Sequence, residues 1–439
     1  MLLDRPTRAT RRWRLRFVLV AVVLVALLVV LQVVAARVGV RGPAASLVDG
    51  YLRQDPGAPA FYCALVLALV LSPRRVRLPT LAVAVAIDVV LGVSRLIADG
   101  AVHSVGNGAI IALTGLTGWS LVRVRGSRRA DVVRGLACGW AFLAATTVGQ
   151  VWLQVTARSR PAVFDAYVST ADHALGNPAW RVGEMFALIG TPGRAPFMVV
   201  YAMLPVAAVV VAAVQLRHGW VRHNVVLTFI AVGVLGPMIY LLFPVVGPAY
   251  AFGPAGWPFA VTTGWPSKLP SFGAPRALSF DTITPRNCVP SLHTAWAVVL
   301  FLHSRSMAPW LRRLGAAWLV VTLLATLGFG YHYGFDLVVG AVFGVTVEAA
   351  VRSATCGWRR DRIALITWGT TVFVVLLAAV RYRAEVLATY PIAGAVVMLG
   401  LLCSVCWGAG TVLGGRRRQP EVAGGPGVED AQALPATTR

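Results

Sequence analysis

The stretch Arg286–Leu300, RNCVPSLHTAWAVVL, places His293 directly before a run of apolar residues. Pro290 favours the first turn of a helix, because its fixed φ suits that position and its missing N–H is not needed there. A helix that begins at this point directs free N–H groups and its positive dipole end toward an anion, and Ser291 adds a hydroxyl. A histidine in this position is either an interfacial side chain or half of a chemical site.

In a second stretch, Gly328–Gly344 (GFGYHYGFDLVVGAVFG), a histidine, His332, again lies just before an apolar run. His332 and Asp336 are four residues apart, so they share one face of a helix. The acid can accept the imidazole N–H, fix its tautomer and raise its basicity. Two histidines at the mouths of apolar helices suit phosphoryl transfer, in which one attacks phosphorus and the other moves a proton. We expect no cofactor and no metal, because no cysteine or glutamate is expected nearby as a further ligand.

The composition predicts an integral membrane protein. Of 439 residues, 57% are hydrophobic and 13% are charged, which is typical of a polytopic helical membrane protein. The formal net charge of +23 comes from short arginine clusters between apolar runs. That pattern follows the positive-inside rule, and we therefore expect a lipid bilayer rather than a nucleic acid as the partner.

The expected fold class is all-α, with both termini cytoplasmic and the two histidines on the extracytoplasmic face of the plasma membrane. Two long outer segments, 157–195 and 246–289, separate some of the spans, and the first is expected to lie along the membrane interface. The tail from 413 is expected to be disordered. The twelve expected spans are 17–36, 59–72, 78–97, 105–122, 135–156, 196–215, 224–245, 290–302, 314–330, 333–351, 363–380 and 389–412.

Other polar residues in or near the spans are interpreted more simply. His218, His223 and His303 fall in inner loops beside arginines and are expected to be solvated. Asp88 lies inside an expected span, seven residues before Arg95, and is either a functional residue or packed against a polar neighbour.

VPSLHTA and HYGFDLVVG, whose histidines are 39 positions apart, resemble the second and third motifs of the type 2 phosphatidic acid phosphatase superfamily. The resemblance covers about 132–352 and implies a six-span core. It implies that His332 is the nucleophile that forms a phosphohistidine and that Asp336 orients it. It also implies that His293 is the general acid/base and that Ser291 contacts the phosphate.

Departures from the family pattern point to one branch. The Lys and Arg-Pro of the family's first motif are absent, and Ala325-Thr326 stand where Ser-Arg would open the third. PVVGPAYAF (Pro244–Phe252) is closer to inositol phosphorylceramide synthases and sphingomyelin synthases, although Ala249 replaces a basic residue often found there. The phosphate is then expected to meet Ser291, Arg286, Asn287 and Tyr331, with Gly247, Tyr250, Lys268, Arg276 and Arg181 as weaker candidates.

The sequence thus predicts a membrane phosphotransferase that moves a phospho-headgroup, such as inositol phosphate, between lipid or polyprenyl substrates. Hydrolysis of a lipid phosphate or polyprenyl diphosphate at the same site remains an alternative. A transporter using Asp88 and Asp336 as relays is the alternative of another class. The expected organisation is a four-span region at 1–131, a catalytic core at 132–352, a two-span region at 353–412 and a tail at 413–439.

Overall fold

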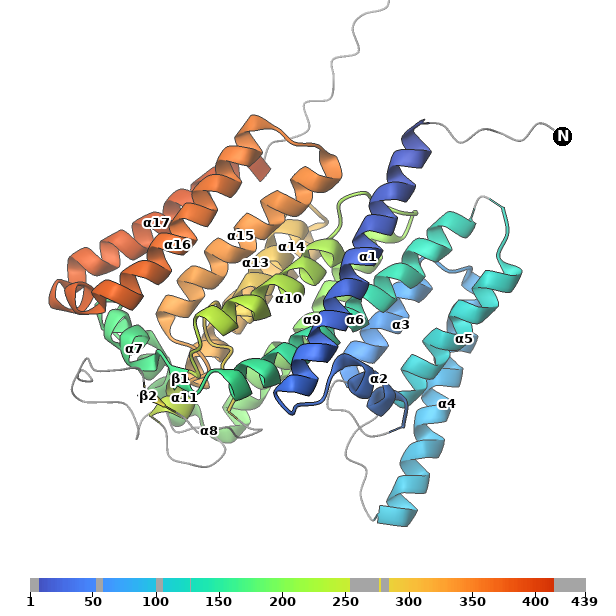
Figure 1. Cartoon of the computed structure of the whole chain (residues 1–439), viewed down its shortest axis with the longest axis horizontal. Coiled ribbons are helices and arrows are strands. Elements are labelled where there is room, and N and C mark those ends of the chain that lie inside the picture. Colours follow the sequence, from blue (N-terminus) through green and yellow to red (C-terminus); the bar gives the residue numbers. More distant parts are fainter. Residues whose placement is uncertain are drawn as a thin grey trace, which may run out of the picture.

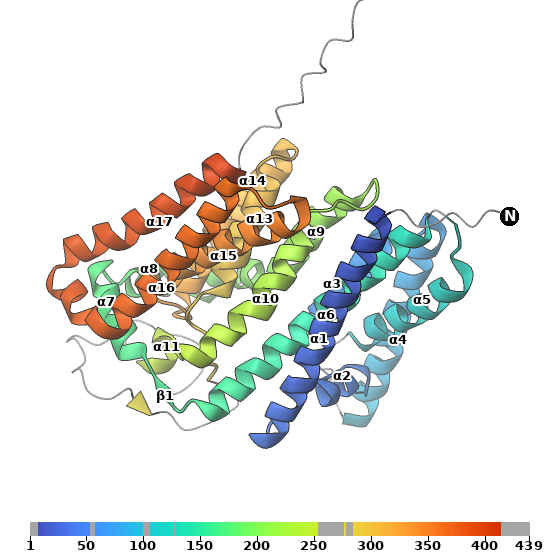
Figure 2. The same cartoon turned by 45° about the horizontal axis from the view of Figure 1, so that its top comes forward.

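The computed structural model describes residues 8–52, 58–99, 106–126, 128–252, 276–277 and 284–413. The described chain is a bundle of helices with one short two-stranded ribbon. In Figures 1 and 2 the N-terminal helices form one side of the bundle, and the two C-terminal helices form the other side. The all-α prediction is confirmed.

Six helices precede the ribbon, and they are long where the sequence is continuously apolar. The helix α6 packs against α3 on one side and against α10 on the other, so it joins the N-terminal helices to the central ones. These N-terminal helices are α1 (Arg8–Arg37), α2 (Pro43–Leu52), α3 (Ala58–Val70), α4 (Arg74–Asp99), α5 (Asn107–Arg123) and α6 (Arg129–Ser159).

The ribbon and the short helices gather at one end of the bundle, the lower edge in Figure 1. Strand β1 (Ala162–Val163) pairs antiparallel with β2 (Arg276–Ala277), and it connects α6 to α7 (Asp165–Ala174). Helix α11 (Pro248–Ala251) lies at the same end.

The remaining helices form the centre and the C-terminal side of the bundle. Helix α13 packs against both α14 and α15, while α16 and α17 pack on the outer side of α15. Their bounds are α8 (Pro178–Ala202), α9 (Leu204–Leu216), α10 (Val225–Leu242), α13 (Leu292–Ser304), α14 (Pro309–Gly328), α15 (Gly334–Cys356), α16 (Arg360–Thr389) and α17 (Pro391–Leu413).

Seven described helices are long and apolar enough to cross a membrane, namely α4, α6, α10, α14, α15, α16 and α17. Helices α8 and α9 pass the same test as a pair bent by 50°. Shorter apolar helices cover 24–37, 59–70 and 292–304. The prediction of a polytopic membrane protein therefore stands, whereas a count of twelve spans is not established by length and composition.

The structure changes one part of the expected organisation. The segment 157–195 contains α7, but Pro178 then starts α8, which continues to Ala202 instead of leaving an interfacial stretch up to 195. A proline at the first helical position is a favourable start. Gly190, with φ of 64°, interrupts the helical geometry inside α8.

Glycines on α15 allow this helix to approach α13 closely. A Cβ at Gly344 would lie 2.8 Å from the carbonyl oxygen of Ala295, and one at Gly340 would overlap the carbonyl oxygen of Ser291. Small residues four apart let membrane helices pack backbone against backbone. This contact sets the spacing of the two helices whose first turns hold Ser291 and Asp336.

We expect Gly340→Ala to destabilise the protein by about 1–3 kcal/mol, the usual cost of overpacking, because the added methyl forces α13 and α15 apart. The melting temperature in detergent should fall relative to the wild type. Gly400→Ala on α17 is the matched control, since a Cβ there meets nothing within 4 Å. Equal melting temperatures for Gly340→Ala and the wild type would show that the close contact is not important for stability.

Candidate active site

Ser291 is the N-cap of α13. Its Oγ accepts hydrogen bonds from the backbone N–H of Thr294 at 3.3 Å and from the Thr294 hydroxyl at 3.0 Å. Ser291 is fully buried, and its own N–H donates to the carbonyl oxygen of Asp336 at 3.3 Å. A helix therefore begins close to the predicted point, at Leu292, but Pro290 lies before the N-cap rather than in the first turn.

His293 follows in the first turn of α13 and is held by aromatic stacking. Its ring lies parallel to that of Tyr201, with centroids 3.8 Å apart and an interplanar angle of 15°. Trp296 meets it edge-on at 5.9 Å. These contacts fix the plane of the imidazole without occupying either ring nitrogen.

His332 lies in the turn before α15 and is almost completely buried. Its Nδ1 is 2.9 Å from the backbone carbonyl oxygen of Cys288 and 3.5 Å from Oδ2 of Asp336. A carbonyl oxygen can only accept, so Nδ1 carries the proton and donates it. The other nitrogen, Nε2, is then the one with a free electron pair. The sequence predicted the acid as the partner of His332, whereas the nearest acceptor is a carbonyl oxygen that no sequence pattern indicated.

Asp336 is completely buried at the start of α15 and collects several donors. Its Oδ2 accepts the backbone N–H of Tyr333 at 2.7 Å, which forms a capping box. The same oxygen accepts the thiol of Cys288 at 2.6 Å. The side chain thus closes the start of the helix and also lies beside the imidazole of His332.

Cys288 was not predicted as part of this site. Its thiol lies between Asp336 and His332, with its sulfur 3.5 Å from Nδ1 of His332. The assumption that no cysteine lies near this pair is wrong. Burial and the neighbouring carboxylate of Asp336 raise the pKa of the Cys288 thiol well above its ordinary value, so it remains a neutral donor. Cys288, His332 and Asp336 are close enough to hold a metal, but their ligand atoms are already hydrogen-bonded to one another and to the protein.

Two buried acids of α7 support the turn that carries His332, and they too were missed. Asp165 accepts the N–H groups of Val246 and Gly247 and the hydroxyl of Tyr333, at 2.9–3.0 Å. Asp172 accepts the N–H of Phe335 at 2.8 Å, at the first turn of α15. Burial, partly offset by these donors, raises the pKa of Asp165 to about 6 and that of Asp172 to about 7. Both acids of the motif FDAYVSTAD, in the segment predicted to lie along the membrane interface, are buried in the protein.

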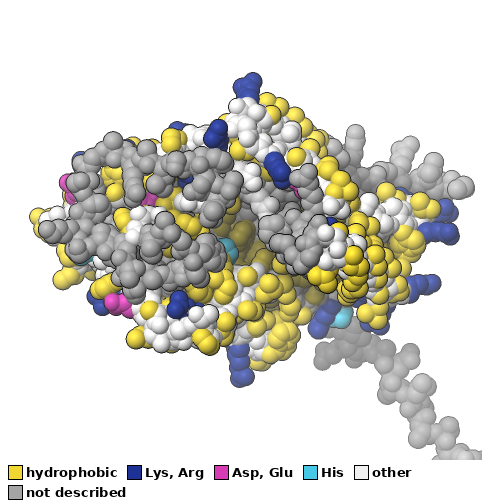
Figure 3. All heavy atoms as spheres, turned by 90° about the horizontal axis from the view of Figure 1, so that it is seen from below, with side chains coloured by type: hydrophobic (Ala, Val, Ile, Leu, Met, Phe, Trp, Pro, Cys, Tyr) yellow, Lys and Arg dark blue, Asp and Glu magenta, His cyan; other side chains and the backbone are white. Residues whose placement is uncertain are grey.

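A cavity of about 290 Å³ joins the predicted catalytic histidines. His293, His332 and Asn287 all contribute to its lining. Figure 3, which views the molecule from below, shows a histidine inside a hollow of this face. Asp336 lies behind His332 and does not line the cavity.

The other predicted phosphate ligands are dispersed. Arg286 is fully buried beside Asn287, with Nη1 3.4 Å from the carbonyl oxygen of Thr284. Tyr331 lies near Tyr201, with ring centroids 5.4 Å apart. Among the weaker candidates, the N–H of Gly247 donates to Asp165, and Tyr250 lies half-buried in α11. Arg181 is exposed and donates to the carbonyl oxygen of Gly176. Arg276 is in β2, and Lys268 lies outside the described residues.

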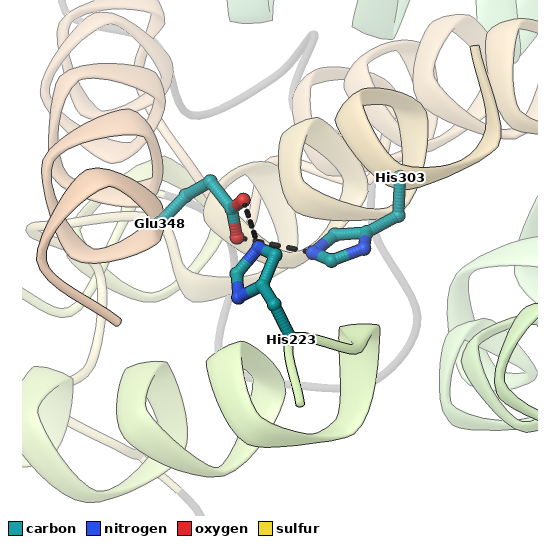
Figure 4. A group of neighbouring side chains, drawn as sticks. All are labelled: His223, His303 and Glu348. Carbon is teal, nitrogen blue, oxygen red and sulfur yellow. Dashed lines mark hydrogen bonds and ion pairs between the residues drawn. The ribbon is translucent and has the colours of Figure 1, made fainter. Parts of the chain in front are cut away.

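A second polar cluster lies at the other ends of α13 and α15, and it corrects the interpretation of two histidines. His223 and His303 were expected to be solvated, but both direct Nε2 at the carboxylate of Glu348, at 2.7 and 3.0 Å (Figure 4). Thr228 donates a further hydrogen bond to this carboxylate at 2.8 Å. Glu348 is nearly inaccessible, and a buried carboxylate is stable only with such partners.

The hydrogen bonds around this cluster decide whether it suits a metal. Oε1 of Gln215 accepts the N–H of Val225 at 3.0 Å, so its amide nitrogen, 3.1 Å from Nδ1 of His303, must donate to that atom. The proton of His303 is therefore on Nε2, the atom that a metal would need. These contacts favour a buried network of hydrogen bonds around the carboxylate of Glu348 over a metal site.

Comparison with known families identifies two regions of the chain. Residues 167–350 match the family described as PAP2 superfamily, and residues 15–155 match the family described as "Domain of unknown function (DUF5933)". No curated protein and no solved structure matches the chain. The first match contains both predicted catalytic histidines and supports a phosphatase or phosphotransferase enzyme.

We expect Asp172→Asn to reduce the pH dependence of stability. A carboxyl whose pKa is raised in the folded state contributes stability that is present at pH 4 and below and is lost as the pH rises through about 7. The melting temperature of the wild type should therefore fall between pH 5 and 8 more than that of Asp172→Asn.

Two further variants make this measurement specific. Asp172→Ala removes the acceptor for the N–H of Phe335, and it should lower stability at every pH by about 1–3 kcal/mol. Glu184→Gln changes an exposed acid on α8 and should leave the wild-type profile unchanged. A wild-type profile in Asp172→Asn would contradict the role assigned to this carboxyl.

Proposed function

We propose, on the premise that residues 167–350 form a phosphatase or phosphotransferase domain of the PAP2 superfamily, that the protein transfers a phospho-headgroup between lipid or polyprenyl substrates. Inositol phosphate is a candidate headgroup. The observation that carries the proposal is the hydrogen bond from Nδ1 of His332 to the carbonyl oxygen of Cys288. It leaves Nε2 as the nucleophilic nitrogen of a residue that lines the same cavity as His293.

In the first half-reaction, the electron pair of His332 Nε2 attacks phosphorus and the bond from phosphorus to the leaving oxygen breaks. His293 donates a proton to that oxygen, so the first product leaves as a neutral alcohol. The imidazole becomes cationic when it is phosphorylated. The carbonyl of Cys288 and the carboxylate of Asp336, 2.9 and 3.5 Å from Nδ1, stabilise this charge.

In the second half-reaction, His293 takes the proton from an acceptor hydroxyl, whose oxygen attacks phosphorus. The phosphorus–nitrogen bond breaks, and its electron pair returns to Nε2 of His332. Water in place of the acceptor hydroxyl gives hydrolysis with the same residues and the same proton transfers. The two reactions therefore differ in the acceptor that reaches the phosphohistidine.

The substrate phosphate is bound chiefly by groups next to α13. Asn287 lines the cavity, and its amide can donate to a phosphate oxygen. Arg286 precedes it and supplies positive charge, while Tyr331 flanks the stacked ring of Tyr201. Ser291 caps α13 by accepting two hydrogen bonds from Thr294, and its own O–H is still able to donate to a phosphate oxygen.

The proposed topology follows the arginine clusters. Twelve spans place both termini in the cytoplasm and place the histidine cavity on the extracytoplasmic face of the plasma membrane. The proposed organisation is 1–131 as an N-terminal region, 132–352 as the catalytic core, 353–412 as a C-terminal pair of spans and 413–439 as a cytoplasmic tail.

Reporter fusions test this topology. A reporter joined after residue 357 should be active only in the cytoplasm, and a reporter inserted at residue 270 should be active only outside. The positive-inside rule predicts this difference because RSATCGWRRDR (352–362) is an arginine-rich inner connection. Both reporters on one side of the membrane would refute the proposed topology.

Trapping of the phosphoryl intermediate tests the division of labour between the histidines. His332→Ala should form no acid-labile, base-stable phosphoryl adduct. His293→Ala should still form it from a substrate with a good leaving group, because that step then needs little protonation. Asp336→Asn should form it more slowly by orders of magnitude, because Asp336 stabilises the cationic imidazole.

Controls separate this mechanism from its alternatives. His218→Ala changes an exposed histidine and should behave as the wild type. An adduct on the His332→Ala protein would reverse the assignment of the two histidines. Product analysis with a labelled lipid phosphate then distinguishes a transferred headgroup from released phosphate.

A further inference from the structure

The cavity next to the histidines extends well beyond the volume that a phosphate needs. Its volume of about 290 Å³ is near the lower limit of cavities that hold small organic ligands, about 300 Å³. The histidines and Asn287 form only part of its lining. The remainder comes from α8, α9, α10, α13 and two helices from before the PAP2 match, α3 and α6.

Of these two helices, α6 contributes more of the residues that line the cavity. It lies in the region 15–155, outside the PAP2 match, and Figure 2 shows it beside α10. Ala60 of α3 adds to the same wall. The α6 residues that line the cavity are Phe142, Ala145, Thr146, Gly149, Gln150 and Leu153.

Polar side chains around the central part of the cavity are bonded elsewhere in the protein. The hydroxyl of Thr146 donates to the carbonyl oxygen of Phe142 at 3.0 Å, and the indole N–H of Trp296 donates to that of Phe229 at 3.0 Å. Tyr240 donates to the carbonyl oxygen of Pro290 at 3.3 Å. These three groups ask for no hydrogen bonds from an occupant, and this suits hydrocarbon. Gln150 of α6 is a further polar side chain of the lining.

We infer that this cavity binds the hydrocarbon chain of the substrate, and that α6, whose lining residues precede the PAP2 match, determines which chains fit. The inference rests on the proposed function, because the phosphate at His293 and His332 fixes the end from which the chain enters. One end of the occupant meets Asn287 and the two histidines, and the other end meets apolar groups of α6 and α10. A phosphate joined to a hydrocarbon chain matches both ends.

The selection is expected to act through shape. A chain that comes from the bilayer gains no hydrophobic free energy by entering an apolar cavity, since lipid is already apolar. Two glycines leave space where α6 faces α10: a Cβ at Gly149 would lie 3.8 Å from the carbonyl oxygen of Gly233. A larger side chain on this wall therefore competes directly with the substrate chain.

The test uses photo-crosslinking, which does not require turnover. The probe is phosphatidic acid with a diazirine near the end of one acyl chain, in phosphatidylcholine nanodiscs. The wild type should give adducts within residues 142–153. Ala145→Leu should reduce labelling of this segment at least about fivefold, because the added side chain fills the cavity.

Matched controls establish that the effect belongs to the cavity. Ala144→Leu makes the same change at the neighbouring half-buried position, which does not line the cavity, and should label as the wild type. A phosphatidylcholine probe with the same diazirine should label 142–153 weakly. Equal labelling by both probes would identify a structural lipid and overturn the inference, as would labelling unaffected by Ala145→Leu.

A turnover assay provides a second test of the inference. Ala145→Leu should lower kcat/KM for dioleoyl phosphatidic acid at least about tenfold, and it should leave a chainless aryl phosphate unchanged. Equal losses for both substrates would overturn the inference. Failure of the proposed function looks different: the wild type would then be labelled at 142–153 but would turn over neither substrate.

Discussion

The buried carboxylate of Asp336 constrains the whole histidine site. It is inaccessible to solvent at the start of an apolar helix, where an unpaired charge would be very costly. The backbone N–H of Tyr333 and the thiol of Cys288 both donate to it, and both must be in place for α15 to begin there. The same two contacts bring the Cys288 carbonyl to Nδ1 of His332. The tautomer of His332 is thus a consequence of how one acid is accommodated.

The acids of α7 extend this support to the neighbouring backbone. Asp172 accepts the N–H of Phe335 in the first turn of α15, and Asp165 accepts the hydroxyl of Tyr333. Free N–H groups at a helix start need acceptors, and here another helix supplies them. Because α7 contacts α15 through buried hydrogen bonds, a movement of α7 would be transmitted to His332.

Glu348 solves a similar problem at the other end of the same helices. Its carboxylate joins α15 to His303 of α13 and to His223 before α10. Helices α13 and α15 are therefore held at both ends by buried acids, and between them by the close contact at Gly340 and Gly344. A rigid pair of helices is what a site needs when its two histidines lie on different elements.

The parts that the sequence predicted are those that depend on local pattern. Long apolar runs predicted the helices, and the run after Pro290 predicted the start of α13, although Pro290 lies before the N-cap rather than in the first turn. His332 and Asp336 were predicted to meet on one helical face; they do meet, but His332 lies in the turn before α15. Cys288, Asp165 and Glu348 were missed because their partners are distant in the chain, for example 168 residues between Asp165 and Tyr333.

The same distinction explains why the residues of α6 that line the cavity had no visible role in the sequence. They carry no motif, and an apolar wall leaves no signature other than small residues such as Ala145 and Gly149. The wall becomes recognisable only when α6 is seen against α10, with the histidines at one end of the space between them. An enzyme with the proposed function must distinguish lipids that share the same kind of hydrocarbon. In the proposed arrangement, the residues of α6 that shape the chain cavity lie outside the PAP2 match, so that substrate choice can change while the histidine site is kept.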